Sequence, residues 1–288
     1  MKILLFGGQG SQSPDMFKAF PEAEVYKTAK EIFGFDVVEK YSAMSLEELA
    51  LTENAQPAIL AYQLAALETY NREHGGEYGA VGGHSLGEYA AAVAASVLTA
   101  ADAFRLIKIR SRAMSETAAK MRKDGNSGVM CAVIMKPTHN INTLPENISA
   151  LAANYNSPDQ LVLSGSETEI AAAEIALKSV DTVKRAVRLN TGGAFHTRYM
   201  SGAADIFAAQ AEGIQFNAPT LDFYSNVTGG KINTNGDTQL NVAYFAKHIT
   251  SPVRFVQEIT QAIADGYTEF DEITPKETLT AFVKKIAK

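Results

Sequence analysis

Residues 82–88 read Gly-Gly-His-Ser-Leu-Gly-Glu and are the strongest indication of the fold, because they place Ser85 between two glycines at Gly-x-Ser-x-Gly spacing. An apolar pair at 80–81 precedes it, and the alanine-rich run 89–95, a good helix former, follows it. A strand, a sharp turn and a helix in that order expose a serine hydroxyl at the end of a sheet. The pattern predicts that Ser85 is a nucleophile; the alternative is a helix cap with chance glycines.

The residues around Ser85 suit that chemistry. A glycine on either side lets the backbone turn tightly and lets a substrate approach without a Cβ in the way. The N–H groups and dipole of a helix N-terminus favour negative charge, such as a developing oxyanion. We therefore expect an active site at this turn.

Bulk properties limit the other possibilities. A chain of 288 residues is long enough for one large α/β domain, alone or with a small insert, and its net charge of −6 argues against general nucleic-acid or membrane-surface binding. The single cysteine, Cys131, lies in an apolar run and offers no zinc spacing, which predicts a buried structural thiol and no metal site. No apolar run approaches the ~18 residues of a membrane span, and the apolar start at 1–6 is too short for a signal peptide. We expect a soluble, cytoplasmic protein and a monomer.

The first part of the chain alternates strands and helices, which is typical of the α/β class with a parallel sheet. The expected elements are a strand at 3–6, helices at 21–33, 45–52 and 55–73, a strand and helix over 80–97, and a helix at 100–121.

The rhythm of the pattern changes after residue 125. Strands are expected at 128–135, 148–155 and 160–164, a helix at 167–179 and a strand at 182–189. This set predicts a small ferredoxin-like α+β insert over 126–190. Residues 1–125 and 191–288 would then form a large α/β-hydrolase-like catalytic domain, whose later elements are a helix at 198–211, a strand at 221–225, helices at 241–248 and 253–265, a strand at 268–273 and a helix at 276–287.

A nucleophilic serine needs a base, and the chain has five histidines. His84 is the neighbour of the serine, and neighbours on a strand point to opposite faces. His74 and His139 have polar surroundings typical of the surface, and His248 ends a helix, where a histidine complements the helix dipole. His196 lies on the small-residue loop 190–196, between a strand and a helix, where catalytic groups are common. We therefore favour His196 as the base, with a lone loop histidine as the alternative.

No acidic residue between Ser85 and His196 stands out as a third member of a triad. A backbone carbonyl could orient the imidazole instead, because the Nδ1–H needs only an acceptor. Arg110 is the other informative residue, since it shares the apolar stripe of the 100–121 helix with Ala103, Ile107 and Met114. A guanidinium there either pairs with an internal carboxylate or clamps the carboxylate of a substrate.

These pieces together resemble malonyl-CoA:acyl carrier protein transacylases and the related acyltransferases of polyketide synthases, over nearly the whole chain. The run at 193–200 is closest to free-standing acyltransferases that serve polyketide synthases in trans. The resemblance rests on Gly8-Gln9-Gly10-Ser11-Gln12, Gln56-Pro57-Ala58, Gly83-His84-Ser85-Leu86-Gly87-Glu88, Arg110, Asn156-Ser157-Pro158-Asp159-Gln160, Gly193-Ala194-Phe195-His196 and Ser251-Pro252-Val253-Arg254.

The resemblance implies a role for each matching catalytic residue. Ser85 would carry the acyl group, and His196 would act as general base and then general acid. Backbone N–H groups of Leu86 and Gln9 would form the oxyanion hole. The main-chain carbonyl of His248 would orient the histidine in place of an acid.

The resemblance also implies a substrate pocket. Arg110 would hold the free carboxylate of malonate, and Asn156, Gln56 and Met114 would belong to the same pocket. In the family, phenylalanine before the histidine accompanies malonyl rather than methylmalonyl groups, and a large ring at Phe195 leaves little room for an extra methyl.

Two positions depart from the family pattern. Gly7 stands where a proline usually precedes the Gly-Gln-Gly-Ser-Gln loop, and Thr274-Pro275-Lys276 replaces a usual Gly-Pro-Gly turn. Neither departure removes a charged or nucleophilic group, so we expect them to affect loop geometry only.

The implied activity is transfer of a malonyl group from malonyl-CoA to the phosphopantetheine thiol of an acyl carrier protein, in polyketide or fatty-acid synthesis, with no cofactor beyond the coenzyme A of the substrate. Two alternatives stay open. An acyl hydrolase that clears carrier proteins needs the same serine and histidine but no carboxylate clamp. A non-catalytic docking partner of carrier proteins needs neither.

Overall fold

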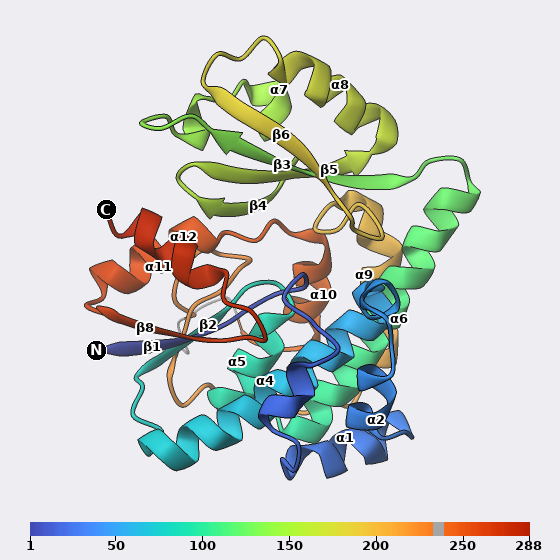
Figure 1. Cartoon of the computed structure of the whole chain (residues 1–288), viewed down its shortest axis with the longest axis vertical. Helices are drawn as coiled ribbons and strands as arrows, with labels where there is room; N and C mark the ends of the chain where they lie inside the picture. Colours follow the sequence, from blue (N-terminus) through green and yellow to red (C-terminus); the bar gives the residue numbers. More distant parts are fainter. Residues whose placement is uncertain (233–238) are drawn as a thin grey trace.

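A computed structural model describes residues 1–232 and 239–288 and contains two separate four-stranded sheets (Figure 1). The first sheet has the order β7-β2-β1-β8, with β1 at Lys2–Phe6, β2 at Ala80–Gly83, β7 at Asp222–Phe223 and β8 at Glu269–Ile273. Every pairing in it is parallel. The predicted parallel sheet of an α/β-hydrolase-like fold is therefore confirmed.

Helices cover this sheet on both faces because the side chains of β1 alternate. Leu4 and Phe6 join the core formed with α4 (Thr52–His74), α5 (Gly87–Ala94) and α6 (Ala100–Lys123). Ile3 and Leu5 join the core formed with α11 (Phe255–Ala264) and α12 (Leu279–Ile286). The helices of this part are α1 Val25–Phe33, α2 Val37–Ser42, α3 Leu46–Ala50, α4 Thr52–His74, α5 Gly87–Ala94, α6 Ala100–Lys123, α9 Ser201–Gln210, α10 Val242–Thr250, α11 Phe255–Ala264 and α12 Leu279–Ile286, with 3-10 turns η1 Met16–Ala19 and η3 Arg198–Met200.

The second sheet lies above the first in Figure 1 and has the order β4-β5-β3-β6, with every pairing antiparallel. Its strands are β3 Gly128–Met135, β4 Ala152–Ser157, β5 Gln160–Ser166 and β6 Val183–Leu189. The one-turn helix α7 (Glu146–Ser149) and helix α8 (Glu167–Leu177) complete a β-α-β-β-α-β order, as the ferredoxin-like prediction required. A hydrophobic cluster of its own supports the boundaries at 126 and 190, which stay a prediction.

Several element boundaries differ from the sequence expectation. The strand expected at 148–155 is wrong at its start, because α7 (Glu146–Ser149) follows Pro145 and the strand begins only at Ala152. Helix α2 was not expected, although Asp36 caps it by accepting the N–H groups of residues 38 and 39. The last helix, expected from 276, begins at Leu279 after the Thr-Pro-Lys turn. The expected helix at 167–179 is α8, Glu167–Leu177.

The two sheets are joined beside the site by the segment that follows α10. Val253 donates its N–H to Ala153 O at 2.8 Å, and Tyr155 donates its N–H to Val253 O at 2.8 Å. This pairing fixes the Ser-Pro-Val-Arg segment against β4, so that residues just before it are held rigidly.

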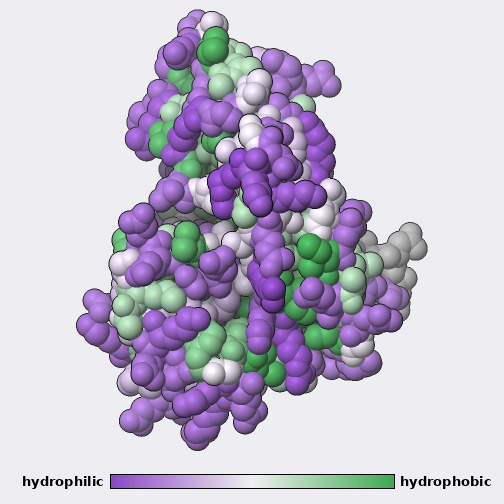
Figure 2. Space-filling model, turned by 90° about the vertical axis from the view of Figure 1, so that its right-hand side faces the viewer, coloured by the Kyte–Doolittle hydropathy of each residue, from purple (hydrophilic) through white to green (hydrophobic). Residues whose placement is uncertain are grey.

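The outside of the molecule has ordinary polarity. The face seen in Figure 2 is largely hydrophilic, with smaller hydrophobic groups on its lower part. Among the described residues, no helix combines the length and apolar character needed to cross a membrane. Cys131 is buried, as predicted for a structural thiol.

Steric contacts explain the glycines of the turn at 83–87. A Cβ on Gly87 would overlap the backbone oxygen and carbon of Phe6, because α5 begins directly against the end of β1. A Cβ on Gly83 would overlap the backbone of residues 87 and 88. Neither neighbour can move without moving the sheet or the helix, so the fold requires glycine at both positions.

We predict that Gly87→Ala lowers the free energy of unfolding by about 1–3 kcal/mol or more, as overpacking does in a rigid site. Denaturant unfolding measures this value. Gly202→Ala is the control, because the nearest atom to its added Cβ is Thr117 Oγ1 at 3.8 Å. Equal stability of the two variants would contradict the steric account.

Candidate active site

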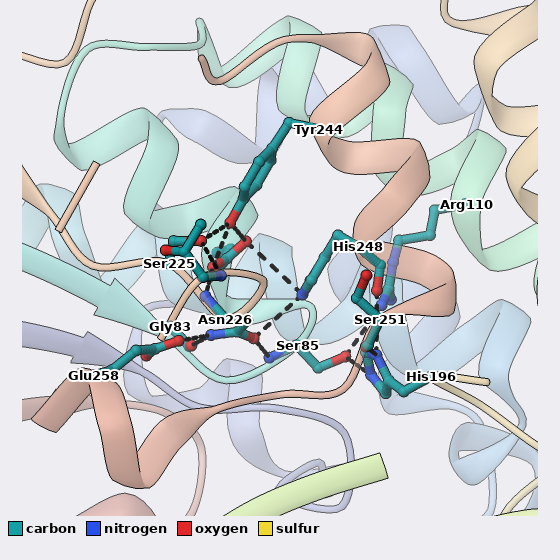
Figure 3. A network of polar contacts seen from close by, with 12 residues as sticks. Gly83, Ser85, Arg110, His196, Ser225, Asn226, Tyr244, His248, Ser251 and Glu258 are labelled. Atoms are coloured by element: carbon teal, nitrogen blue, oxygen red, sulfur yellow. Dashed lines mark hydrogen bonds and ion pairs between the residues drawn. The ribbon is translucent and has the colours of Figure 1, made fainter. Parts of the chain in front are cut away.

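Ser85 lies in the turn between β2 and α5, at the centre of Figure 3. Its backbone φ is +54°, a left-handed conformation that is rare for a residue with a side chain. Its N–H donates to Asn226 Oδ1 at 2.7 Å, which helps to hold this strained conformation. The predicted strand–turn–helix context is confirmed.

The structure brings His196 to this serine from 111 positions further along the chain, with His196 Nε2 2.8 Å from Ser85 Oγ. The ring Nδ1 faces two backbone carbonyls, His248 O at 3.2 Å and Ser251 O at 3.0 Å. Because both neighbours of Nδ1 are acceptors, the proton sits on Nδ1 and Nε2 is free to accept the serine proton. The imidazole is thus oriented by backbone, as expected without a triad acid, and Ser251 adds a carbonyl that the sequence did not indicate.

Among the described residues, none of the other histidines is hydrogen-bonded to the Ser85 hydroxyl, in agreement with the choice of His196 as the base. His84 lines the cavity, and its Nε2 contacts Asn156 Oδ1 at 2.8 Å. His74 and His139 are exposed. His248 is completely buried at the end of α10, and its Nε2 contacts Asn226 Oδ1 at 3.2 Å.

Arg110 is the largest fully buried side chain of α6 and reaches the same hydroxyl. It is 1% exposed, donates from Nη1 to Gln56 Oε1 at 2.7 Å and from Nη2 to Ser85 Oγ at 3.0 Å. Within residues 1–232 and 239–288, no carboxylate lies at ion-pair distance from it. Arg110 therefore has no ion-pair partner among the described residues, and its positive charge lies beside the Ser85 hydroxyl instead.

The predicted residues surround one cavity of about 290 Å³. Its lining includes Gln9, Gln56, Ser85, Leu86, Arg110, Met114, Asn156, Phe195 and His196. Side chains of β3, β5 and α12 close its other walls, among them Met130, Val162 and Phe282. His248 lies outside the lining and reaches the site through its main-chain carbonyl. Nearly every residue singled out from the sequence therefore meets in one place.

The electrostatics keep the imidazole neutral. Burial lowers the pKa of His196 to about 3, and the positive charge of Arg110 and the ring of His84 add to the effect. A neutral imidazole is the form that can accept a proton from Ser85. The cation beside Oγ also favours any negative charge that develops on that oxygen.

A buried polar network behind the serine was missed by the sequence analysis. It contains Glu88, Ser225, Asn226, Tyr244 and Glu258, all drawn in Figure 3 or bonded to residues labelled there. One signal was available: Ser225-Asn226 follows a short strand of the parallel sheet, at the edge where functional side chains gather.

The two departures from the family pattern turn out to be in contact with one another. A Cβ on Gly7 would overlap the side chain of Thr274, so the threonine fills the space that a larger residue at position 7 would take. Gln63 donates to Gly7 O at 2.7 Å and holds the loop from its other side. The Gly-Gln-Gly-Ser-Gln loop is therefore supported in this chain by a different pair of residues.

An oriented imidazole on a serine at a helix N-terminus, with a buried cation alongside, is an arrangement that can form and break an acyl ester. The site thus has the geometry of an acyl-transferring serine enzyme. Comparisons with known proteins agree with this class.

A family model described as an acyl transferase domain matches residues 4–288. A malonyl CoA-acyl carrier protein transacylase from Synechocystis sp. is 34% identical over 98% of this chain and 92% of its own. An acyl carrier protein S-malonyltransferase from Vibrio cholerae has a TM-score of 0.87 at 27% identity, covering 99% of this chain and 93% of that one. A chain from the solved complex of a type II PKS acyl carrier protein with its malonyl-transacylase has a TM-score of 0.83 at 28% identity, covering 99% and 92%.

The chain belongs to the acyl transferase domain family, and it is an enzyme of the acyltransferase class. This confirms the resemblance inferred from its motifs. The match covers more than nine tenths of the Synechocystis relative and of the Vibrio cholerae structure, so it includes the whole of the fold.

The lowered pKa of His196 predicts the acid side of the pH profile. A base with a lowered pKa stays unprotonated, and hence active, until the pH falls well below the ordinary imidazole value of 6.5. We expect kcat/KM for formation of the acyl-enzyme to hold constant from neutral pH down through 6.5 and to fall only at more acidic pH. A fall with its midpoint at or above 6.5 would contradict the burial argument.

Proposed function

We propose that the enzyme transfers a malonyl group from malonyl-CoA to the phosphopantetheine thiol of an acyl carrier protein through a malonyl-Ser85 intermediate. The observation that carries the proposal is the buried guanidinium of Arg110, 3.0 Å from Ser85 Oγ in the same cavity. A fixed cation at that distance from a nucleophile suits an acyl group that ends in a carboxylate. The relatives are malonyl CoA-acyl carrier protein transacylases, which supports the same substrates for this enzyme.

In the first half-reaction, Ser85 Oγ attacks the thioester carbonyl of malonyl-CoA while His196 Nε2 takes the hydroxyl proton. The backbone N–H groups of Leu86 and Gln9 are proposed to bind the oxyanion of the tetrahedral intermediate. The C–S bond then breaks, and coenzyme A leaves with the proton from His196.

The second half-reaction reverses these steps with a new thiol. The phosphopantetheine thiol gives its proton to His196, and its sulfur attacks the malonyl ester. The C–Oγ bond breaks, and Ser85 recovers its proton from the imidazolium. The carbonyls of His248 and Ser251 stabilise that imidazolium and keep its ring in place through both halves.

The guanidinium retains a donor without a partner, which we propose for the malonyl carboxylate. Nη1 is held by Gln56, whereas Nε is buried and has no hydrogen-bond partner among the described residues. Nε and Nη2 lie on one side of the group and can bind both oxygens of a carboxylate. We therefore assign Gln56 the role of orienting Arg110, and Met114, 3.6 Å from Gln56 Nε2, that of packing against it.

Phe195 and Asn156 complete the proposed pocket. The ring of Phe195 occupies the wall beside His196, where it would crowd a branched acyl group, so we propose malonyl over methylmalonyl. Asn156 lines the cavity while its amide holds His84 and Gln160. The proposal needs no cofactor beyond the coenzyme A of the donor.

The alternatives lack a comparable observation. A hydrolase acting on acylated carrier proteins has no use for a buried guanidinium at the serine, and a docking partner has no use for the oriented imidazole. The working form is proposed to be a cytoplasmic monomer, and a single, buried cysteine suits a reducing compartment. Comparison of carrier proteins from fatty-acid and polyketide systems would decide which pathway it serves.

We predict that the purified enzyme, given malonyl-CoA and a phosphopantetheinylated carrier protein, forms malonyl-carrier protein far faster than free malonate. Mass spectrometry of the carrier and quantification of malonate measure the two products. Malonate as the main product in the presence of the carrier would favour the hydrolase.

We also predict that Arg110→Ala lowers kcat/KM with malonyl-CoA between about tenfold and a hundredfold more than with acetyl-CoA, the range expected for a lost charged hydrogen bond. Arg105→Ala is the matched control on the same helix, because Arg105 is exposed and pairs with Asp102 at 2.7 Å. Equal losses with both acyl groups would remove the carboxylate clamp from the account.

A further inference from the structure

Asn226 lies directly behind the nucleophile and outside the cavity. It is completely buried, follows β7 and is absent from the residues that line the pocket. Figure 3 shows its side chain next to Ser85. Its Oδ1 accepts the N–H of Ser85 at 2.7 Å, and its Nδ2 donates to Gly83 O at 2.5 Å. The same amide thus binds the backbone at the nucleophile and two residues before it.

The orientation of this amide is fixed by its other neighbours. Nδ2 also donates to Glu258 Oε1 at 2.5 Å, and the Asn226 main-chain N–H donates to Glu88 Oε1 at 2.6 Å. A flipped amide would place its NH₂ against the Ser85 N–H and its oxygen against a carbonyl and a carboxyl group. Only one orientation satisfies every partner, so the oxygen is held toward Ser85.

The amide also reaches the base. His248 Nε2 lies 3.2 Å from Asn226 Oδ1, and the carbonyl of the same histidine lies 3.2 Å from His196 Nδ1. Oδ1 can only accept, so Nε2 is the donor. One short path, Ser85 N–H to Asn226 to His248 to His196, therefore connects the backbone of the nucleophile with the ring of its base.

The hydrogen bonds along this path hold two residues whose backbone is strained. Ser85 and His196 have φ values of +54° and +59°, and a residue persists in this strained region only when its surroundings hold it there. A turn that relaxed would move Oγ away from Nε2. Reactivity is sensitive to such shifts, since a misplacement of about 1 Å can cost about a hundredfold in rate.

We propose that Asn226 is a positioning residue of this enzyme, which fixes the strained turn of Ser85 and, through the side chain of His248, the carbonyl that orients His196. The inference rests on the proposed function only for the acyl donor used to measure it. Asn226 lies outside the cavity, so it would affect the rate only through the positions of Ser85 and His196.

The burial of the two carboxyl groups bonded to Asn226 agrees with its positioning role. Burial raises the pKa of Glu88 to about 8 and the pKa of Glu258 well above its ordinary value. At neutral pH these carboxyl groups therefore carry little negative charge next to the nucleophile. Tyr244 donates to Glu88 at 3.0 Å and closes the network on the side away from the cavity.

The test compares Asn226→Asp with Ser225→Ala. The first variant keeps the size of the side chain and an acceptor oxygen but loses both Nδ2 donations, to Gly83 O and Glu258 Oε1. These two donations are the contacts that hold Oδ1 toward Ser85, and an oxygen in the place of Nδ2 would face two acceptors. Ser225→Ala removes a buried hydrogen bond of 2.7 Å to Tyr244 in the same network without touching the backbone of Ser85. Stopped-flow acylation by malonyl-CoA gives the rate, and binding of malonyl-CoA in a Ser85→Ala background gives the affinity.

We expect Asn226→Asp to lower the acylation rate between about tenfold and a hundredfold while malonyl-CoA affinity stays within about twofold of the parent. The ¹⁵N signals of the His196 imidazole should shift in this variant and not in Ser225→Ala. An unchanged rate in folded Asn226→Asp would overturn the proposal, as would parallel losses of rate, affinity and melting temperature in both variants.

Two His248 variants keep the inference testable if Asn226→Asp does not fold. His248→Gln retains an N–H donor toward Asn226 and the main-chain carbonyl, so it should keep most of the rate, whereas His248→Leu should lose it. Equal rates in these two would overturn the path through His248.

A donor-independent probe separates this inference from the proposed function. Labelling of Ser85 by a fluorophosphonate depends on the serine and its base and needs no malonyl group. Slow labelling of Asn226→Asp supports the positioning role even if the wild-type enzyme proves unable to transfer malonate. Labelling at the wild-type rate would contradict it.

Discussion

The site is arranged around the 2.8 Å hydrogen bond between Ser85 Oγ and His196 Nε2. Neither residue reaches this geometry by local preference, since both have positive φ values. The parallel sheet positions Ser85, because β2 and α5 meet at a turn that requires glycine at positions 83 and 87. The end of α10 and the segment after it position His196, because the carbonyls of His248 and Ser251 hold the imidazole and the pairing of Val253 with β4 fixes that segment. The buried guanidinium of Arg110 donates a hydrogen bond to Ser85 Oγ and places a positive charge beside it.

Much of this was predictable from the sequence because the decisive signals are local. The glycine spacing at 83–87 and its flanking apolar and alanine-rich runs gave the turn, and the buried run at 3–6 gave the central strand. His196 followed from its loop and from the need for a base. Arg110 was recognisable because a cation interrupts an apolar helical stripe, although the pattern left an ion pair and a substrate clamp equally open.

The remainder depends on contacts between distant segments, which a single sequence does not display. The anchoring of Ser85 by Asn226 joins positions 141 apart, and the second carbonyl on His196 comes from a serine whose side chain is irrelevant. The mutual fit of Gly7 and Thr274 is similar, since each residue is unremarkable until the loop packs on the end of β8. The strand start at 152 was missed because Pro145 begins a short helix inside a β-rich stretch.

The proposed transfer requires one covalent intermediate, malonyl-Ser85, which acid-quenched peptide mapping after mixing with malonyl-CoA would detect. The expected result is a malonyl adduct on the peptide that contains Ser85, absent from Ser85→Ala and formed much more slowly by His196→Ala. An adduct on another residue, or turnover without any adduct on Ser85, would contradict the account.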